Sequence, residues 1–442
     1  MCGFVVVKTG TPVDESRVQR RGPDGRGCLT REGFEFYHYL LHVTGERTLQ
    51  PFEKGHVVCV FNGEIYNHPF QRSDGEVIIP LYVKHGVEFA RHLDGEFAIA
   101  LYDFERRVAV FATDAFGTKP LFIRGVEAAS YRSALPGMAV PPNTTLVRQF
   151  DGAKEQAFVN VAFDFGNQSE RSYDRWLTAF SGAVKKRSTS DCFIGLSSGY
   201  DSGAIACELL EQGMPFGAYS IRGNERQDVL EARVERANSA LLELSVDDYE
   251  NEVNFLRRHC EPASFLAEAQ MELHCDDLFD DPGAIGSSFI FARARAKGQK
   301  VYLSGQGADE ILSDYALTPK VSSLHGRFPV QLAPWKNFYG GCQRAYLTKE
   351  EYVGGCHGIE TRYPFLDTEL VQEFLWLAPE LKNRYYKAPL HEYFARHEFP
   401  FWEGAKRGFG ADMNLTQADE ARLARLFAWR KRPGSFPTSL PQ

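Results

Sequence analysis

The sequence lacks long apolar runs and any sign of a leader segment. Its longest apolar runs, residues 4–7 and 57–61, are far too short to span a bilayer. The N-terminus has no basic region followed by an apolar stretch and a small-residue cleavage site. We therefore expect neither a transmembrane helix nor a signal peptide, and no membrane partner.

The sequence also lacks a cysteine framework and an excess of positive charge. Nine cysteines, an odd number with no C-x-x-C pair, fit neither a disulfide scaffold nor a zinc site. Fifty Lys and Arg residues against 58 Asp and Glu give a net charge of -8, which disfavours a general nucleic-acid binder. These absences favour a reduced, cytoplasmic enzyme that binds no nucleic acid.

The composition is that of a globular protein of two or three domains. The chain has 442 residues, and domains average roughly 150 residues. Apolar residues make up 43% and charged residues 24%, which argues against disorder. In the first half, short apolar or alternating runs are separated by Gly and Asn turns, at residues 3–7, 57–61, 97–102 and 108–112. This pattern predicts packed antiparallel sheets.

The second half changes to alternating strand and helix patterns. After a helical pattern at 173–185, they occur at residues 192–196, 202–212, 216–221, 228–238, 289–297 and 301–304. Such alternation predicts a doubly wound parallel sheet with its ligand at the carboxyl ends of the strands. The chain reads as mostly helical from residue 314. We predict domains at 1–155 and 165–425, followed by an irregular tail at 426–442.

Cys2 is the first chemical signal. If Met1 is removed, Cys2 carries a thiol and a free α-amine whose pKa near 8 suits a general base. Three turn-forming segments follow, at residues 21–25, 62–67 and 73–76. The Asn62 side chain and the Gly63 amide suit an oxyanion hole, and a carboxylate in 73–76 suits an ammonium group. Taken singly, each segment also fits an ordinary loop, since Asn-Gly is itself a hairpin turn signal.

Taken together, these pieces resemble the class II glutamine amidotransferase domain, the cysteine branch of the N-terminal nucleophile hydrolases. The matching segments are residues 1–3, 21–24, 62–67, 73–76, 93–98 and 114–121. The resemblance implies an αββα sandwich that hydrolyses glutamine to glutamate and ammonia. It also implies that Cys2 is the nucleophile, that Asn62 and Gly63 are oxyanion donors, and that Glu64 and Asp74 hold the α-amino end of glutamine.

One departure concerns the glutamine carboxylate. The family usually carries an Arg for it in a His-x-Arg-Leu segment. Here residues 38–41 align with that segment and put Leu40 in place of the Arg. Arg47, further along the same loop, is a substitute to consider.

A second signal lies between an apolar strand and a helix. Residues 194–203 combine small and hydroxylated side chains with an Asp, which suits a phosphate chain at a helix N-terminus and a magnesium ion. A tight turn alone has the same composition. The segment resembles the pyrophosphate loop of the N-type ATP pyrophosphatases, with Ser198 replacing the first Gly. It is not a Walker-A loop, because no Gly-Lys-Ser/Thr is present.

A third segment, residues 303–310, completes a set that resembles the asparagine synthetase family over almost the whole chain. Further matches are residues 358–367, Lys387 and residues 406–409. The resemblance implies an ATP-pyrophosphatase domain with a helical C-terminal part. It also implies that ATP and Mg²⁺ convert a small carboxylate substrate into an acyl-adenylate. Ammonia from the glutaminase site then attacks it, in the narrow case turning aspartate into asparagine.

The same resemblance suggests roles for individual residues of the second half. Asp201 and Asp309 would bind the metal, and Lys406 would neutralise charge in the transition state. Lys387 is a weaker phosphate ligand. The pyrophosphate would lie among Ser197, Gly199 and Ser202. The AMP group would be lined by Leu196, Ile221, Ser304 and Gly305.

Gln306 is a second departure, because the asparagine-forming members carry Glu there, where it can assist the incoming ammonia as a base. Gln takes up no proton at neutral pH. Three readings therefore stay open. The protein is an asparagine-forming enzyme, or a relative that amidates another carboxylate or uses another amine, as lactam-forming relatives do, or a degenerate binding protein. A homodimer is compatible with each.

Overall fold

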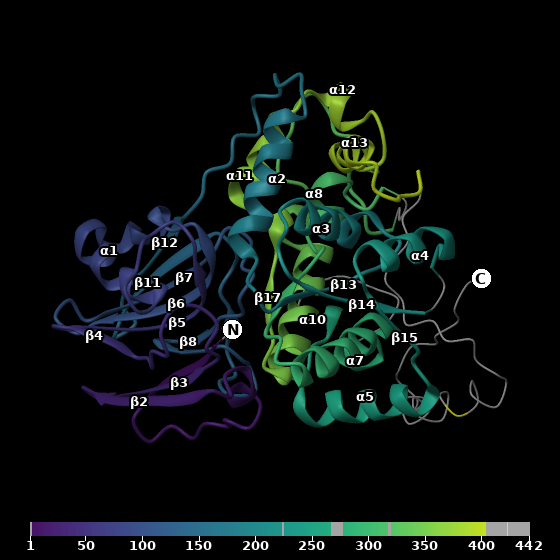
Figure 1. The fold of residues 1–442 in the computed structure, drawn as a ribbon. Coiled ribbons are helices and arrows are strands. Elements are labelled where there is room, and N and C mark those ends of the chain that lie inside the picture. Colours follow the sequence, from purple (N-terminus) through teal and green to yellow (C-terminus); the bar gives the residue numbers. More distant parts are fainter. Residues whose placement is uncertain (1, 223–224, 267–276, 317–319, 404–421, 423–442) are drawn as a thin grey trace, which may run out of the picture.

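The computed structural model of this chain describes residues 2–222, 225–266, 277–316, 320–403 and 422. Two regions lie side by side, a β-rich one formed by the first part of the chain and a mixed one formed by the rest (Figure 1). The last strand of the first region ends at Val159 and the first long helix of the second begins at Asp174. Within the described residues, no helix combines the length and the apolar character needed to cross a membrane.

The first region contains two six-stranded antiparallel sheets, as its apolar runs predict. In spatial order, the first sheet consists of β10 (Met138–Ala139), β8 (Phe122–Arg124), β9 (Glu127–Ala129), β1 (Gly3–Lys8), β3 (Phe34–Leu40) and β2 (Gly25–Arg31). The second consists of β12 (Glu155–Val159), β11 (Thr144–Gln149), β7 (Val108–Thr113), β6 (Gly95–Asp103), β5 (Val57–Ile65) and β4 (Phe52–Lys54).

Strand β1 shows why these segments read as continuous apolar runs. Phe4 and Val6 point into the core between the two sheets, whereas Val5 and Val7 point to the opposite face. That opposite face packs against α10 (Gly341–His357) of the second region. On the outer side of the second sheet lie α1 (Ile78–His85) and the 3-10 helices η2 (Asp74–Val77) and η3 (Gly86–His92). Because both faces of β1 are covered, alternation is lost in its sequence.

The second region is built on a five-stranded parallel sheet. Its spatial order is β15 (Ala240–Leu242), β14 (Gly217–Ile221), β13 (Cys192–Gly195), β16 (Val301–Leu303) and β17 (Glu360–Arg362). The direction of the strand order reverses between β13 and β16. Ligands of open α/β sheets bind at this point, so the loops after β13 and β16 lie where a ligand is expected.

Helices surround this sheet. They are α2 (Asp174–Arg187), α3 (Tyr200–Glu211), α4 (Gln227–Arg236), α5 (Val246–His259), α7 (Pro282–Ala296), α8 (Ala308–Leu312), α9 (Lys336–Tyr339), α10, α11 (Thr368–Trp376), α12 (Pro379–Lys382) and α13 (Ala388–His397). Short 3-10 turns are η1 (Val18–Arg21), η4 (Leu278–Asp280) and η5 (Pro364–Leu366). The described residues after 314 are mostly helical, as predicted, but β17 interrupts them. Strand β17 and α10 lie on the side of the second region that faces the first (Figure 1).

Candidate active sites

Cys2 lies in a buried position directly before β1. Its backbone N–H donates to Asn62 Oδ1 at 2.9 Å, and its Sγ lies 3.9 Å from the carbonyl oxygen of Leu41. Burial raises the pKa of the Cys2 thiol to about 11. A thiol held protonated in this way needs a base beside it to become a nucleophile.

Asn62 and Gly63 lie inside β5, and the prediction that they form a loop after the strand is wrong. The strand continues because it stays paired with β6, with Asn62 opposite Ala98 and Gly63 opposite Phe97. The side chain of Asn62 is fully buried, and its Nδ2 donates to no group of the described residues. Leaving a buried donor unpaired costs about 1–3 kcal/mol, so this amide is held ready for an acceptor.

Gly63 is required by its backbone geometry. Its φ is +138°, and a Cβ atom there would lie 1.8 Å from the carbonyl oxygen of Glu96. Only glycine accepts both conditions.

The predicted ligands of the glutamine α-amino group form a buried acidic cluster. Burial raises the pKa of Glu64 well above its usual range and that of Asp74 to about 6, and neighbouring Glu360 adds to both shifts. Asp74 Oδ2 accepts from the Ile65 N–H at 2.8 Å, which fixes its direction. The guanidinium of Arg362 lies 3.2 Å from Glu64 Oε1. This surplus of buried carboxyl groups suits a substrate ammonium.

Leu40 stands where the resembling family carries the Arg that binds the glutamine carboxylate. Arg47 lies beside Leu40. A Cβ atom on Gly25 would lie 3.3 Å from Arg47 Nη2 and 3.8 Å from Leu40 Cβ, so both side chains approach the same point. Arg47 donates to the Asp24 carbonyl. Together with Arg72, it also lines a cavity of about 580 Å³.

The loop after β13 is organised by hydroxyl groups. Ser197 Oγ and Ser202 Oγ lie 2.9 Å apart, and the Gly199 N–H donates to Ser197 Oγ at 3.1 Å. The N–H of Ser198 donates to the carboxylate of Glu225 at 2.8 Å, and the Ser198 hydroxyl donates to the same oxygen. The loop thus presents donors that already hold an anionic oxygen, as a pyrophosphate loop must.

Arg233 of α4 supports this loop, and no sequence motif pointed to it. It is fully buried and donates from Nη1 to the carbonyls of Ser197 at 2.7 Å and Gly199 at 2.6 Å. Its Nη2 donates to no group of the described residues. Burial lowers the pKa of Arg233 to about 10, which leaves it charged at neutral pH. A buried cation behind the loop favours an anion in front of it.

Asp201 and Asp309 converge on one ammonium group. Lys387 Nζ lies 2.5 Å from Asp201 Oδ1 and 2.8 Å from Asp309 Oδ1, and the Tyr386 hydroxyl donates to Asp309 at 3.0 Å. Burial lowers the pKa of Lys387, but the two carboxylates outweigh burial and raise it well above its usual range. The loops meet closely, because a Cβ atom on Gly305 would lie 2.8 Å from Asp201 Cβ. Two carboxylates arranged around one cation fit a magnesium site.

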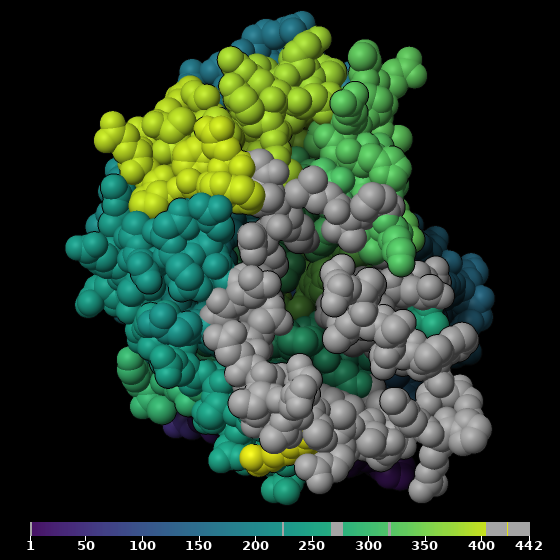
Figure 2. Space-filling view, turned by 90° about the vertical axis from the view of Figure 1, so that its right-hand side faces the viewer, coloured from purple at the N-terminus to yellow at the C-terminus, as the bar shows by residue number. Residues whose placement is uncertain are grey.

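The remaining predicted ATP ligands lie in the same part of the fold. Leu196 and Ile221 are buried, and so is Ser304, whose N–H donates to the Arg362 carbonyl at 2.9 Å. The Gln306 N–H donates to Ser304 Oγ at 3.0 Å. Lys406 lies outside the described residues. Figure 2 shows the side of this region that faces away from the first, with yellow and green segments at the top and teal segments at the left.

A buried ion-pair network joins the two regions. Lys119 of the first region lies 3.3 Å from Glu96 and 2.9 Å from Glu351 of α10. Arg187 of α2 lies 2.6 Å from Glu96, and Arg21 lies 2.9 Å from Glu351. Both regions therefore contribute charges to each other's buried groups.

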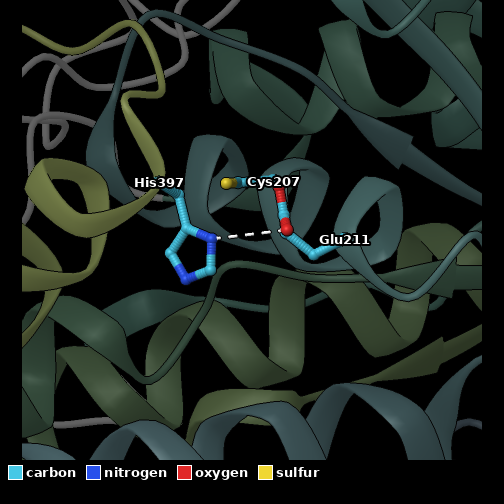
Figure 3. Close-up of side chains that lie close together, drawn as sticks. All are labelled: Cys207, Glu211 and His397. Carbon is cyan, nitrogen blue, oxygen red and sulfur yellow. Dashed lines mark ion pairs between the residues drawn. The ribbon is translucent and has the colours of Figure 1, made fainter.

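A different group of potential metal ligands lies away from both centres. Cys207 and Glu211 of α3 point toward His397 at the end of α13, with ligand atoms within 4.8 Å of one another (Figure 3). His397 Nδ1 and Glu211 form an ion pair at 3.5 Å. Burial raises the pKa of Cys207 to about 12, so its sulfur stays a thiol at neutral pH and is a poor ligand. We therefore interpret the group as an ion pair beside a buried thiol.

Comparison with known families divides the chain at the same place as the structure does. A family model described as a glutamine amidotransferase domain matches residues 1–163. A family model described as asparagine synthase matches residues 175–345 and 342–432.

Curated relatives match most of the chain. A putative glutamine-hydrolysing asparagine synthetase of Methanocaldococcus jannaschii is 28% identical over 406 residues, which cover 79% of this chain and 71% of that protein. Asparagine synthetase B of Escherichia coli is 28% identical over 420 residues, covering 83% and 72%. The Homo sapiens asparagine synthetase is 26% identical over 444 residues, covering 86% and 77%.

A solved structure of NMN synthetase from Francisella tularensis is also similar, at 12% identity and a TM-score of 0.23. It covers 54% of this chain and 97% of that one, and a likeness at this level carries no argument.

Proposed function

The chain belongs to the asparagine synthase family, and we propose that it is a glutamine-dependent amide synthetase with two cooperating centres. The first hydrolyses glutamine, and the second adenylates a small carboxylate with ATP and amidates it with the ammonia released. Aspartate is the first carboxylate to test, because the relatives are named asparagine synthetases.

At the first centre, Cys2 attacks the side-chain amide of glutamine. Its burial keeps the thiol protonated, so its own α-amine, exposed when Met1 is removed, takes the proton. Asn62 Oδ1 accepts from the Cys2 nitrogen, which holds that amine in place. The unpaired Nδ2 of Asn62 and the Gly63 N–H then stabilise the oxyanion. Glu64 and Asp74 bind the α-ammonium group.

Arg47 is our choice for the glutamine carboxylate. Its guanidinium approaches the same point as Leu40, the residue that stands where the family carries its Arg. Moving the cation along the loop keeps a guanidinium near this end of the site, where it can hold a carboxylate in a bidentate manner.

At the second centre, Ser197, Gly199 and Ser202 surround the pyrophosphate, with Arg233 behind the loop. Asp201 and Asp309 would hold Mg²⁺, and the metal would supply charge neutralisation for the departing pyrophosphate. Lys387 is the weaker phosphate ligand of this group, since both carboxylates already bind it. Leu196, Ile221, Ser304 and Gly305 line the AMP group, and Lys406 is the remaining cation of the proposed set.

One observation supports cooperation between the centres more than any other. Arg362 of β17 touches both of them: its side chain pairs with Glu64 of the glutamine site, and its carbonyl accepts from Ser304 beside Gln306. This shared residue is our reason for proposing that ammonia passes from the first centre to the second beside β17.

The test supplies the purified protein with glutamine, Mg-ATP and a panel of carboxylates that begins with aspartate. Glutamate, AMP, pyrophosphate and the amide are measured. We expect glutamate, AMP and amide in equal amounts with the correct carboxylate. Formation of AMP and amide with a carboxylate other than aspartate would identify a relative with another acceptor. If no carboxylate gives a product, the proposal that the protein is an enzyme is contradicted.

A Cys2→Ala variant separates the two centres. We expect it to lose glutamine-dependent synthesis by at least 10³-fold and to keep synthesis with ammonium chloride, because only the first centre uses the thiol. Cys59→Ala, at another buried cysteine of the first region, is the matched control. Loss of ammonium-dependent synthesis in Cys2→Ala would contradict the two-centre proposal.

A further inference from the structure

Amide formation releases a proton that Gln306 cannot take. When ammonia attacks an acyl-adenylate, the new C–N bond forms with the nitrogen lone pair, and the bond from the acyl carbon to the phosphate oxygen breaks with AMP as the leaving group. The nitrogen must then lose one proton. A glutamine side chain at position 306 donates and accepts hydrogen bonds but takes up no proton near neutral pH.

A carboxyl group lies directly beside Gln306. It belongs to Glu350, which α10 places behind the loop that follows β16. The side chains of Ser304 and Gln306 lie close enough to it to lower its pKa. Glu350 is only 6% exposed, and its Oε2 has no hydrogen-bond partner among the described residues.

The surroundings of this carboxyl group keep it poised to titrate. Burial raises the pKa of Glu350 to about 7. The charge of neighbouring Lys349 lowers this pKa in part, while its Nζ lies 3.5 Å from Asp281. Glu351 is already paired with Arg21 and Lys119.

The other titratable groups that face Glu350 are the phenols of Tyr302 and Tyr363. Burial raises the pKa of both well above its usual range, so they stay neutral. No described residue forms an ion pair with this carboxyl group, whereas a fully structural carboxylate at such a depth is normally paired.

We propose that Glu350 is the base of the amidation step and accepts the proton that ammonia loses as it attacks the acyl-adenylate. It does from α10 what a glutamate at position 306 does in relatives that carry one. In this proposal the Gln306 side chain, which lies beside the same carboxyl group, orients it toward the acyl carbon. This inference rests on the proposed function, since it needs the acyl-adenylate to exist at this site.

The decisive variant is Glu350→Gln, which keeps the shape and removes the base. Two readouts divide the reaction: aspartate-dependent exchange of pyrophosphate into ATP reports adenylation, and amide formation from ammonium chloride reports the second step. We expect exchange within threefold of the original protein and amide formation lower by 10²–10⁴-fold, the usual contribution of a general base. A merely structural role would lower both together.

Glu373→Gln is the matched control. Glu373 of α11 is also 6% exposed and also has an oxygen without a partner among the described residues, but it pairs with Arg175. We expect both readouts to stay within threefold of the original protein.

A second test measures how the rate of amide formation depends on pH. With rates expressed per concentration of free ammonia, amide formation by the original protein should fall below about pH 7, tenfold per pH unit, as Glu350 becomes protonated. Glu350→Gln should lose this acid limb. In Gln306→Glu two carboxyl groups share the site, which raises the pKa of the pair, so the limb should move to higher pH.

Rescue completes the test. The double variant Gln306→Glu with Glu350→Gln returns a carboxylate to the loop. We expect its rate of amide formation to be at least tenfold higher than that of Glu350→Gln alone. If Glu350→Gln does not fold, the profiles of the original protein and of Gln306→Glu decide. An unchanged limb in Gln306→Glu, or normal amide formation in a folded Glu350→Gln, overturns this inference alone. Absence of exchange in the original protein with every carboxylate overturns the proposed function as well.

Discussion

The two candidate centres neutralise their charges in different ways. Glu64 of the first centre takes its cation, Arg362, from the second region, and Glu96 on the adjacent strand pairs with Arg187 from there as well as with Lys119 of its own region. Asp201 and Asp309 of the second centre instead share Lys387 of their own region.

This difference indicates which centre depends on the other. The glutamine site is complete only when the second region packs against it, because buried carboxylates without cations are costly. The ATP site holds its own counter-charges, so a ligand that brings new charges must rearrange pairs that already exist. Glutamine use should therefore respond to changes at the interface, and ATP use should not.

The largest effect that would sharpen this comparison is expected from Asp309→Asn. Losing one of two carboxylates that hold Mg²⁺ should lower AMP formation by about 10⁴-fold, since metal stabilisation of the pyrophosphate is worth several kcal/mol. Glutamine hydrolysis without ATP should stay within threefold, measured as glutamate released. A matching loss of glutamine hydrolysis would show that the second centre is not self-contained.

A loss of about 3–5 kcal/mol in the free energy of unfolding is expected from Lys119→Met. It removes the shared cation of Glu96 and Glu351, both of which are buried. Urea denaturation followed by fluorescence measures the change. Arg171→Met is the control, because Arg171 and Glu380 form an exposed pair, and its midpoint should not move measurably. Equal midpoints for the two variants would show that the buried ion pairs between the two regions contribute little to stability.

Asn62→Ala should lower kcat for glutamine by about 10²–10³-fold, the usual effect of losing one oxyanion donor. Ammonium-dependent synthesis should be unchanged, since that route bypasses the first centre. Comparing the two nitrogen sources on one preparation measures the effect. A fall with ammonium as well would mean that Asn62 supports the fold rather than the oxyanion.

The smallest effect is expected from Arg47→Ala. Losing one charged hydrogen-bonding partner of the glutamine carboxylate should raise KM for glutamine about tenfold, or about 1.4 kcal/mol, with little change in kcat. Arg72→Ala is the control: it lines the same cavity but is bound to Glu76 at 2.9 Å. The assignment of Arg47 is wrong if both variants behave alike.

Local sequence patterns predicted a large part of the fold. Apolar alternation marked β1, β5, β6 and β7, and the strand–helix alternation marked the parallel sheet, because period and burial are local properties of a strand or helix. Strand β17 was missed, since three residues with the sequence Glu-Thr-Arg show neither an apolar run nor an alternation.

The candidate sites divide in the same manner. Motifs within short segments pointed to Cys2, Asn62, Asp201 and Asp309, and their roles remain predictions for the experiments above. Asn62 and Gly63 were predicted in a loop because Asn-Gly is a turn signal, but pairing with β6 carries the strand through them.

The sequence by itself determined the family, the two kinds of sheet and the segments that carry the chemistry. Only the tertiary structure decided which charges meet: Arg362 with Glu64, Lys387 between Asp201 and Asp309, Arg233 behind the loop after β13, and Glu350 beside Gln306. The physical reason is that these partners lie tens to hundreds of residues apart. Local periodicity sets which face of an element is buried, but the packing of whole elements sets which buried charge finds which partner.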